Sequence, residues 1–349
     1  MPNSVKVEGL ARKIWYGRSR WFLALLPLSL LFAVGAAFRR ELYRRGVLRS
    51  FDIGTPVIVV GNITTGGTGK TPVTMWFASR LRERGFKPGI VSRGYGGRVG
   101  DLPLEVTEES DPGAVGDEPL LMAQRLICPV VVHPNRVRAA KLLAAAGCDV
   151  VIADDGLQHY QLRRRFEIAV VDGARGFGNG QLLPAGPLRE PLSRLRSVDR
   201  IMVQGGEGAA LSPAAAGGGR CTRFELVASS IHGLQEPKTL ALDALRGRTV
   251  HAIAAIGHPR RFFRLLEEHG ASVIPHEFPD HAQLSHSDLR FDDGLDVLMT
   301  EKDAVKIARP APPNCWYVAV DLRLAGDDPP EWLENMANDL RRGTTNRNE

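Results

Sequence analysis

The apolar segment VIVV at residues 57–60 is followed directly by the segment GNITTGGTGKT at residues 61–71. The first segment predicts a buried strand, the second a glycine-rich loop, and the residues from about Pro72 onward predict a helix. This order is typical of a phosphate-binding loop, in which backbone N–H groups and the positive end of the helix bind anionic oxygens. We expect the Lys70 ammonium to reach the β- and γ-phosphates of a bound nucleotide and the Thr71 hydroxyl to ligate Mg²⁺.

The loop departs from the usual pattern at one position, because Thr64 stands where the first glycine is expected. We expect the doubled glycine at positions 66 and 67 to compensate for this difference. The alternative is a glycine-rich turn that only resembles a nucleotide site. The predicted nucleotide-binding residues are Thr64, Thr65, Gly66, Gly67, Thr68, Gly69, Lys70 and Thr71.

Positive charge is concentrated at the N-terminus. Residues 1–50 contain ten Lys or Arg and two Glu, a net charge of +8, whereas the remaining 35 basic and 37 acidic residues give −2. A nucleic-acid-binding protein more often spreads a basic face over its folded domain, so we expect no nucleic-acid partner. The four cysteines include no Cys-x-x-Cys pair, which argues against a zinc site or a disulfide framework and fits a reducing compartment.

The basic N-terminal residues flank the segment WFLALLPLSLLFAVGAAF at residues 21–38, which has no charged side chain. Eighteen residues lie at the lower limit for spanning a bilayer, which takes roughly 20. A cleaved signal peptide and a buried core helix are the alternatives to a membrane-associated helix. We favour a helix in the cytoplasmic leaflet, because the phosphate-binding loop that follows belongs in a compartment that contains ATP.

Short apolar strands alternate with helical patterns after the loop, which predicts an α/β fold with a doubly wound parallel sheet of the P-loop NTPase (RecA-like) type. A second, smaller α/β unit follows a Gly- and Ala-rich stretch at 205–219. The tail after Arg341 is polar and is expected to be disordered. The predicted divisions are a membrane-associated segment (1–50), a nucleotide-binding core (51–222), a smaller α/β domain (223–325), and a C-terminal helix with its tail (326–349).

Two adjacent carboxylates, Asp154 and Asp155, come directly after the apolar strand at residues 150–153. In open α/β sheets, ligands bind at the carboxyl ends of the strands. A phosphate-loop enzyme needs an acidic residue there to hold Mg²⁺, directly or through water. We therefore predict that this pair belongs to the metal site, the alternative being a turn with solvated aspartates.

Three further segments carry candidate groups, each with an ordinary structural alternative. Asp117 precedes a helical pattern, where an acid is common as an N-cap. His281 follows Asp280 in the second unit, and an Asp-His pair is a frequent general-base arrangement, although a single histidine is more often structural. Arg189 and Glu190 end a rigid loop, from which the guanidinium can bind phosphate and the carboxylate a metal or a hydroxyl. The alternative for that loop is an ordinary surface loop.

Taken together, the motifs resemble those of one family, the tetraacyldisaccharide 4′-kinases of lipid A biosynthesis. The similarity covers nearly the whole chain, and the order of the motifs makes it specific. The substitution at Thr64 is itself typical of this family. The motifs are GNITTGGTGKTP (61–72), SRGYGG (92–97), GDEP (116–119), DDGLQH (154–159), PAGPLRE (184–190), FPDH (278–281) and TEKDAVK (300–306).

The resemblance implies an ATP- and Mg²⁺-dependent transfer of phosphate to the 4′-hydroxyl of a tetraacylated glucosamine disaccharide 1-phosphate. It also implies a monomeric enzyme at the cytoplasmic face of the bacterial inner membrane, in contact with the lipids of that membrane. Asp117 then matches the general base, His281 its assistant, and Lys70 and Arg189 further catalytic residues. The implied metal-site residues are Thr71, Asp154, Asp155 and Glu190.

Two other classes of protein share some of these features. Membrane-associated ATPase switches of the partition or site-placement type also have doubled glycines before Gly-Lys-Thr. They typically carry a signature lysine just before the glycines, whereas this chain has Thr65 there. A non-catalytic nucleotide-binding scaffold would not require Asp117, His281 and the Asp154-Asp155 pair together.

Overall fold

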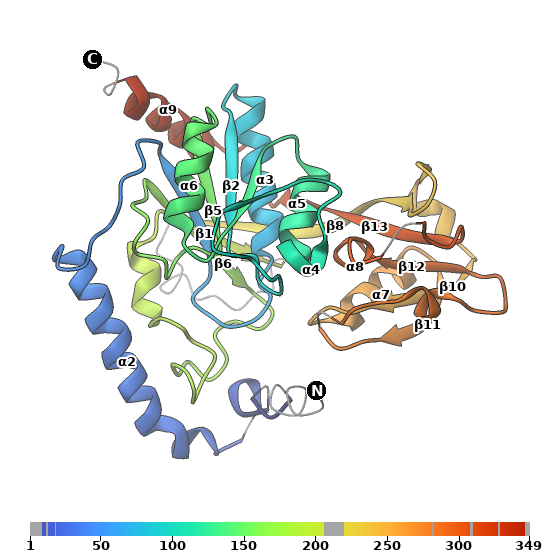
Figure 1. Ribbon diagram of the computed structural model, residues 1–349. Helices are drawn as coiled ribbons and strands as arrows, with labels where there is room; N and C mark the ends of the chain where they lie inside the picture. The colour runs from blue at the N-terminus through green and yellow to red at the C-terminus, as the bar shows by residue number, and fades with distance from the viewer. Residues whose placement is uncertain are drawn as a thin grey trace.

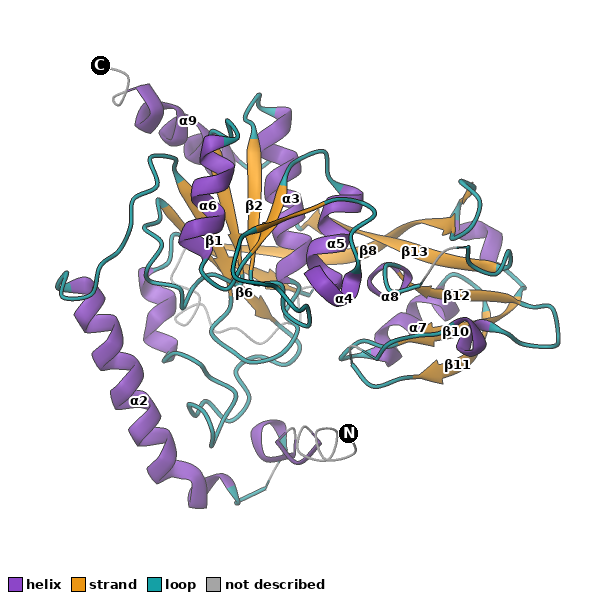
Figure 2. Ribbon diagram, viewed as in Figure 1, coloured by secondary structure: helices purple, strands orange, loops and turns teal. Residues whose placement is uncertain are grey.

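A computed structural model of the chain describes residues 9–11, 13–17, 19–205, 220–280, 282–307, 310–326 and 329–345. Its strands form one 13-stranded sheet with the order β11-β10-β12-β13-β8-β7-β6-β1-β5-β2-β4-β3, and β9 pairs with β8. The predicted α/β class with a largely parallel sheet is confirmed, as Figures 1 and 2 show. The strands are β1 (Val57–Gly61), β2 (Pro88–Ser92), β3 (Leu104–Val106), β4 (Val130–Val132), β5 (Val150–Asp154), β6 (Phe166–Asp172), β7 (Arg200–Gln204), β8 (Cys221–Gly233), β9 (Thr239–Leu240), β10 (Thr249–Ala254), β11 (Ser272–Glu277), β12 (Asp296–Thr300) and β13 (Cys315–Leu324).

Helices cover the sheet on both faces (Figure 2). In β1, Ile58 and Val60 pack into one apolar cluster, while Val57 and Val59 pack into another on the opposite face. Burial on both faces explains why this strand is apolar throughout rather than alternating. The helices are α2 (Phe22–Arg44), α3 (Lys70–Glu83), α4 (Pro112–Val115), α5 (Asp117–Arg125), α6 (Arg136–Ala145), α7 (Pro259–Glu268), α8 (Glu301–Ala304) and α9 (Glu331–Thr345), with short 3₁₀ turns at η1 (Leu192–Ser197), η2 (Leu242–Leu245) and η3 (His286–Leu289).

Two long strands, β8 and β13, carry the sheet from the nucleotide-binding core into the smaller α/β part (Figure 1). The start of β8 pairs in parallel with β7, and the strand pairs antiparallel with β13 from Phe224 to Gly233. The register shifts between Ala319 and Val320, which marks a bulge in this ribbon. The expected division at residue 222 thus falls inside β8.

The C-terminal helix α9 packs back on the nucleotide-binding core. Leu333 and Leu340 lie in the same apolar cluster as Phe77 of α3, and the Trp332 ring lies 6.0 Å from the Phe77 ring. The helix continues to Thr345, so the prediction of disorder after Arg341 is wrong for residues 342–345. Residues 346–349, and nearly all of the Gly- and Ala-rich stretch 205–219, lie outside the described residues.

Of the helices within the described residues, α2 alone is long and apolar enough to cross a membrane, with a mean hydropathy of 2.0. Only 6% of its most apolar window is buried. Its large apolar side chains are exposed, among them Leu30 at 66% and Leu31 at 70%. Such exposure excludes the alternative of a buried core helix and is consistent with association with a membrane.

Candidate active site

The glycine-rich loop forms a turn that leads into the first turn of α3. Gly66 and Gly69 have φ values of 94° and 82°, in the left-handed region that side chains disfavour. Gly69 is the N-cap of α3, so the helix begins at Lys70, two residues before the predicted position. The Asn62 amide nitrogen donates to the Gly66 carbonyl at 3.3 Å and to the Thr68 hydroxyl at 3.2 Å. These bonds hold the loop in shape around the N-terminal end of α3.

The loop at residues 184–190 pairs with the backbone of the glycine-rich loop. Thr64 forms an antiparallel bridge with Leu188. On either side of that bridge, the Arg189 N–H donates to the Ile63 carbonyl at 2.7 Å and the Thr65 N–H donates to the Pro187 carbonyl at 2.8 Å. Thr64 therefore has an extended backbone, which explains why a glycine is not needed at this position.

The carboxylate pair lies at the carboxyl end of β5, next to β1, and its two members have different surroundings. Asp154 is 1% exposed and accepts a hydrogen bond from the Thr74 hydroxyl at 3.0 Å. Asp155 has a φ of 47° and its carboxylate lies 3.7 Å from the Lys70 ammonium and 3.3 Å from the Arg189 guanidinium. Lys70, Arg189 and Asp155 thus meet where the phosphates of a nucleotide would lie.

The pKa values of the two aspartates are therefore shifted in opposite directions. Burial raises the pKa of Asp154 to about 7, and the negative charges of Glu118 and Asp155 add to this effect. Burial also acts to raise the pKa of Asp155, but Lys70 and Arg189 outweigh it and the net pKa is lowered. Asp155 is thus ionised at neutral pH, and Asp154 is a group that a cation would deprotonate.

The oxygen donors at this place fit Mg²⁺. Thr71 offers a hydroxyl from the first turn of α3, the helix whose Lys70 lies near Asp155 and whose Thr74 donates to Asp154. Mg²⁺ is usually held by one or two carboxylates together with phosphate oxygens and water, so no cage made entirely of protein groups is required. Within the described ranges no cluster of three or more His, Cys, Asp or Glu is placed to hold a metal ion.

Glu190 is held by three side chains in the interior. Its carboxylate accepts hydrogen bonds from the Tyr160 hydroxyl and, at 2.9 Å, from the Gln158 amide, and it lies 3.7 Å from Arg194. Direct ligation of a metal by Glu190 stays a prediction. The Gln158 amide also donates to the Asn62 carbonyl at 3.0 Å, so the network connects Glu190 to the glycine-rich loop.

Asp117 is the first residue of α5 and lies against two lysines of the smaller part of the chain. Its carboxylate is 3.8 Å from the Lys306 ammonium, which also donates to Asp303 at 2.7 Å. The neighbouring Glu118 accepts from Lys302 at 3.0 Å. Sequence reasoning missed the roles of Lys302 and Lys306, although both fall in the TEKDAVK motif.

The FPDH loop lies close to Lys302. Burial lowers the pKa of Lys302, but the charges of Glu118 and Asp280 outweigh this effect and the net pKa is raised. Glu118 also raises the pKa of Asp154, so the start of α5 lies between the carboxylate pair and the second unit. The predicted position of His281 lies outside the described residues.

Four arginines surround His159 of the DDGLQH loop. Burial lowers the pKa of His159 to about 4, and the charges of Arg136, Arg164, Arg39 and Arg93 lower it further. Arg136 is 6% exposed, and its Nε atom has no hydrogen-bond partner among the described residues. A buried guanidinium with an unused donor, beside other cations, is typical of a site for an anion.

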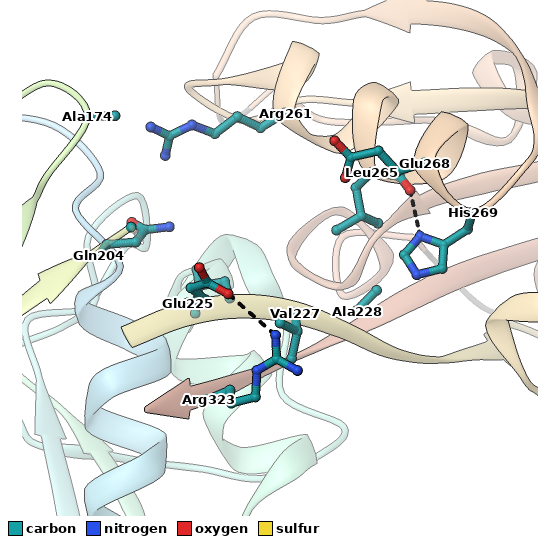
Figure 3. A pocket seen from close by; sticks show the side chains of 12 residues that line it. Ala174, Gln204, Glu225, Val227, Ala228, Arg261, Leu265, Glu268, His269 and Arg323 are labelled. Carbon is teal, nitrogen blue, oxygen red and sulfur yellow. Dashed lines mark hydrogen bonds and ion pairs between the residues drawn. The ribbon is translucent and has the colours of Figure 1, made fainter. Parts of the chain in front are cut away.

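On the other side of the glycine-rich loop, a cavity of about 530 Å³ separates the core from α7 (Figure 3). Gln204 lies at the end of the cavity next to Gly69, and Glu225 and Arg323 line its floor from β8 and β13. Arg261 reaches across from α7 toward Asp172 of the core, 3.3 Å away. The cavity therefore opens beside the phosphate-binding loop, on the side opposite the carboxylate pair.

Arg175 also connects the core with α7. Its guanidinium donates to the Gly67 carbonyl at 3.1 Å and lies 2.8 Å from Nε2 of His258, at the start of α7. Asp172, at the end of β6, pairs with Arg175 as well as with Arg261. Hydrogen bonds and ion pairs therefore connect the glycine-rich loop with the smaller part of the chain.

The chain is similar to a set of enzymes with one shared name. It matches the family described as tetraacyldisaccharide-1-P 4′-kinase over residues 21–341. It is 51% identical over 300 residues to the tetraacyldisaccharide 4′-kinase of Alkalilimnicola ehrlichii, covering 86% of this chain and 88% of that protein. It is 45% identical over 320 residues to the protein of that name from Nitrosococcus oceani, covering 91% of each.

A solved structure has the same architecture. The fold is similar to that of LpxK from Aquifex aeolicus, whose "apo" form was crystallised in complex with ATP, with a TM-score of 0.75 and 29% sequence identity. The match covers 91% of this chain and 99% of the other.

Proposed function

The chain belongs to the tetraacyldisaccharide-1-P 4′-kinase family, and we propose that it transfers the γ-phosphoryl group of ATP to the 4′-hydroxyl of a tetraacylated glucosamine disaccharide 1-phosphate. The product is the lipid A precursor lipid IVA. The observation that supports this best is the meeting of Lys70, Asp155 and Arg189 beside the glycine-rich loop. Phosphoryl transfer depends mainly on positioning and on charge stabilisation, and this arrangement offers both.

ATP binds with its triphosphate in the glycine-rich loop. The backbone N–H groups of residues 66–71 and the N-terminal end of α3 bind the phosphate oxygens. Lys70 and Arg189 share Asp155 as a partner, so both cations are held close to the β- and γ-phosphates. We place the nucleoside in the cavity between Gln204 and α7, because that cavity adjoins the loop at Gly69.

Thr71, Asp154 and Asp155 would hold Mg²⁺. When bound, this ion neutralises charge on the β- and γ-phosphate oxygens. Asp154 is the residue whose protonation state decides whether the site can accept the ion, since burial raises its pKa to about 7. For Glu190, the contacts with Tyr160 and Gln158 favour a role in orienting the loop that carries Arg189.

Asp117 accepts or orients the proton of the attacking hydroxyl group. Its carboxylate lies at the start of α5, beside Glu118, whose charge acts on Asp154. His281 would support it from the second unit, in the FPDH loop whose Asp280 acts on Lys302. Because these groups come from two parts of the chain, closure around both substrates would complete the base.

The acceptor is expected to stay in the membrane while its sugar reaches the site. The exposed apolar face of α2 would associate with the cytoplasmic face of the bacterial inner membrane and its lipids. The arginines around His159, above all Arg136 with its unused donor, fit the 1-phosphate of the acceptor. We propose that the enzyme acts as a monomer, because the groups named above all belong to one chain.

The test is transfer of ³²P from [γ-³²P]ATP to the acylated disaccharide 1-phosphate in detergent, with Mg²⁺ present. We expect a labelled lipid whose formation depends on the acceptor. ATP hydrolysis without labelling of the lipid would instead favour a membrane-associated ATPase switch. A Lys70→Ala variant is the matched control, because the loss of this ammonium should abolish both transfer and hydrolysis.

A further inference from the structure

Ser29 is the one described residue of α2 that is buried, although it lies in the middle of the apolar segment. It is 5% exposed, whereas its neighbours Leu28 and Leu30 are 53% and 66% exposed. A hydroxyl group in this position removes apolar area from a membrane-associated helix. Its presence therefore calls for a function other than contact with lipid.

The Ser29 hydroxyl holds one turn of the loop that carries Arg189. It donates to the Leu182 carbonyl at 2.8 Å and accepts from the Ala185 N–H at 2.9 Å. Ala185 is fully buried. Without the hydroxyl its N–H would lose this acceptor in the interior, where an unpaired donor is costly.

A second contact from the N-terminal residues acts on the same turn. The indole N–H of Trp15 donates to the Pro184 carbonyl at 2.9 Å. The backbone is closely packed at Gly186, where a Cβ atom would lie 2.2 Å from the Gln181 carbonyl oxygen. The position of the turn is therefore set by the N-terminal contacts and by close backbone packing.

Backbone bonds connect this turn directly to the phosphate-binding loop. The Leu183 N–H donates to the Leu188 carbonyl at 2.9 Å, and Leu188 is bridged to Thr64. The next residue, Arg189, donates its N–H to Ile63 and its guanidinium to Asp155. A short series of hydrogen bonds thus connects Ser29, through the turn and Leu188, to Arg189 and the phosphate-binding loop.

The other end of α2 reaches the second loop of the site. The Arg39 guanidinium donates to the Gln158 carbonyl at 3.2 Å, and the Tyr43 ring lies 5.8 Å from that of Tyr160. Figure 1 shows α2 running beside the core rather than away from it. The helix is consequently in contact with both the PAGPLRE and the DDGLQH loops.

We propose that Ser29 is a positioning residue, through which the membrane-associated helix α2 holds Arg189 and the phosphate-binding loop in the geometry needed for transfer. This inference rests on the proposed function of Arg189. It makes α2 part of the scaffold of the active site in addition to its contact with lipid. It also predicts that the two properties of the helix can be separated by mutation.

The experiment compares Ser29→Ala with a Leu30→Ala/Leu31→Ala double variant in the full chain. Ser29→Ala makes α2 more apolar, so sedimentation with phospholipid vesicles should be retained, while kcat in detergent falls about tenfold as Arg189 loses its position. The KM for ATP should change less than about threefold, because most loop N–H groups remain in place. The double variant should show the opposite result, weaker sedimentation and an unchanged kcat in detergent.

A Trp15→Phe variant removes the second bond to the turn and should lower kcat in the same way, which keeps the proposal testable if Ser29→Ala fails to fold. A kcat of Ser29→Ala within twofold of that of the wild type would overturn the proposal. Parallel loss of sedimentation and activity would also overturn it, since Ser29 would then act through membrane contact alone. If the wild-type protein transfers no phosphate to the lipid, the proposed function itself fails, and that result is independent of any variant.

Discussion

Replacing Lys306 with methionine tests how much the buried ion pairing of this lysine stabilises the folded chain. The Lys306 side chain is fully buried and lies 2.7 Å from Asp303, which is itself fully buried. The Asp303 carboxylate also accepts hydrogen bonds from the Thr300 hydroxyl at 2.6 Å and from the Ala255 N–H at 3.0 Å. Lys306→Met would leave this buried charge without its cation.

The expected cost follows from that burial. Removing one partner of a buried pair typically destabilises a protein by about 3–5 kcal/mol. The matched control is Lys302→Met. The Lys302 ammonium pairs with Glu118, and the Lys302 and Glu118 side chains are 22% and 35% exposed. For such a partly exposed pair we expect a cost of about 1 kcal/mol or less.

The assay is urea-induced unfolding of the full chain, followed by tryptophan fluorescence and compared at equal protein concentration. A double variant, Lys306→Met/Asp303→Asn, should recover part of the loss because the unpaired charge is gone. If Lys306→Met and Lys302→Met lowered the unfolding free energy equally, the argument from burial would be refuted.

Three further predictions concern the site. Asp117→Ala should lower kcat by about 10²–10⁴-fold while ATP binding, measured by calorimetry, is retained; full activity would rule out its role as the base. The Mg²⁺ concentration needed for half-maximal activity should rise as the pH falls from 8 to 6, because the pKa of Asp154 is raised to about 7 and its neutral form is a poor ligand. A Mg²⁺ requirement that does not change over this pH range would contradict the prediction. The pKa of His159 is lowered from 6.5 in the unfolded chain to about 4 in the folded chain. As the pH falls from 6.5 to 4, the unfolded chain binds a proton at this histidine that the folded chain does not, so the folded state loses stability over this range. His159→Gln should therefore reduce the loss of thermal stability between pH 6.5 and pH 4, and an unchanged loss would argue against the shift.

The elements around the nucleotide site could be predicted because their signals are local. A wholly apolar strand, a glycine-rich turn and a helix start lie within residues 57–83, and the acids at 154 and 155 directly follow another apolar strand. Thr64 looked like a defect because the bridge to Leu188 that makes a glycine unnecessary joins residues 124 positions apart (188 − 64). Asp117, expected just before a helix, is instead the first residue of α5, and it follows a Gly116 with a φ of 90°.

The remaining features depend on contacts between distant segments. The pair of Lys306 and Asp117 joins two parts of the chain, and no pattern in the sequence around either residue predicts that they lie together. The same holds for Ser29, which reads as one polar residue in an apolar run until its partners at 182 and 185 are known. The docking of α9 on the core likewise required the three-dimensional arrangement, since the sequence predicted only a C-terminal helix.

The ribbon of β8 and β13 has a mechanical consequence for this enzyme. A two-stranded ribbon resists stretching along its strands but twists readily, so the smaller part of the chain would rotate about the ribbon axis rather than slide. We expect the ribbon to twist at the bulge at Ala319 and Val320, where the regular pairing is interrupted. The Arg125 guanidinium of α5 donates to the Val320 carbonyl there at 2.6 Å. We therefore expect Arg125 to restrain this rotation. Amide hydrogen exchange at the bulge, compared between the wild type and Arg125→Met, would measure the restraint, and equal exchange would contradict it.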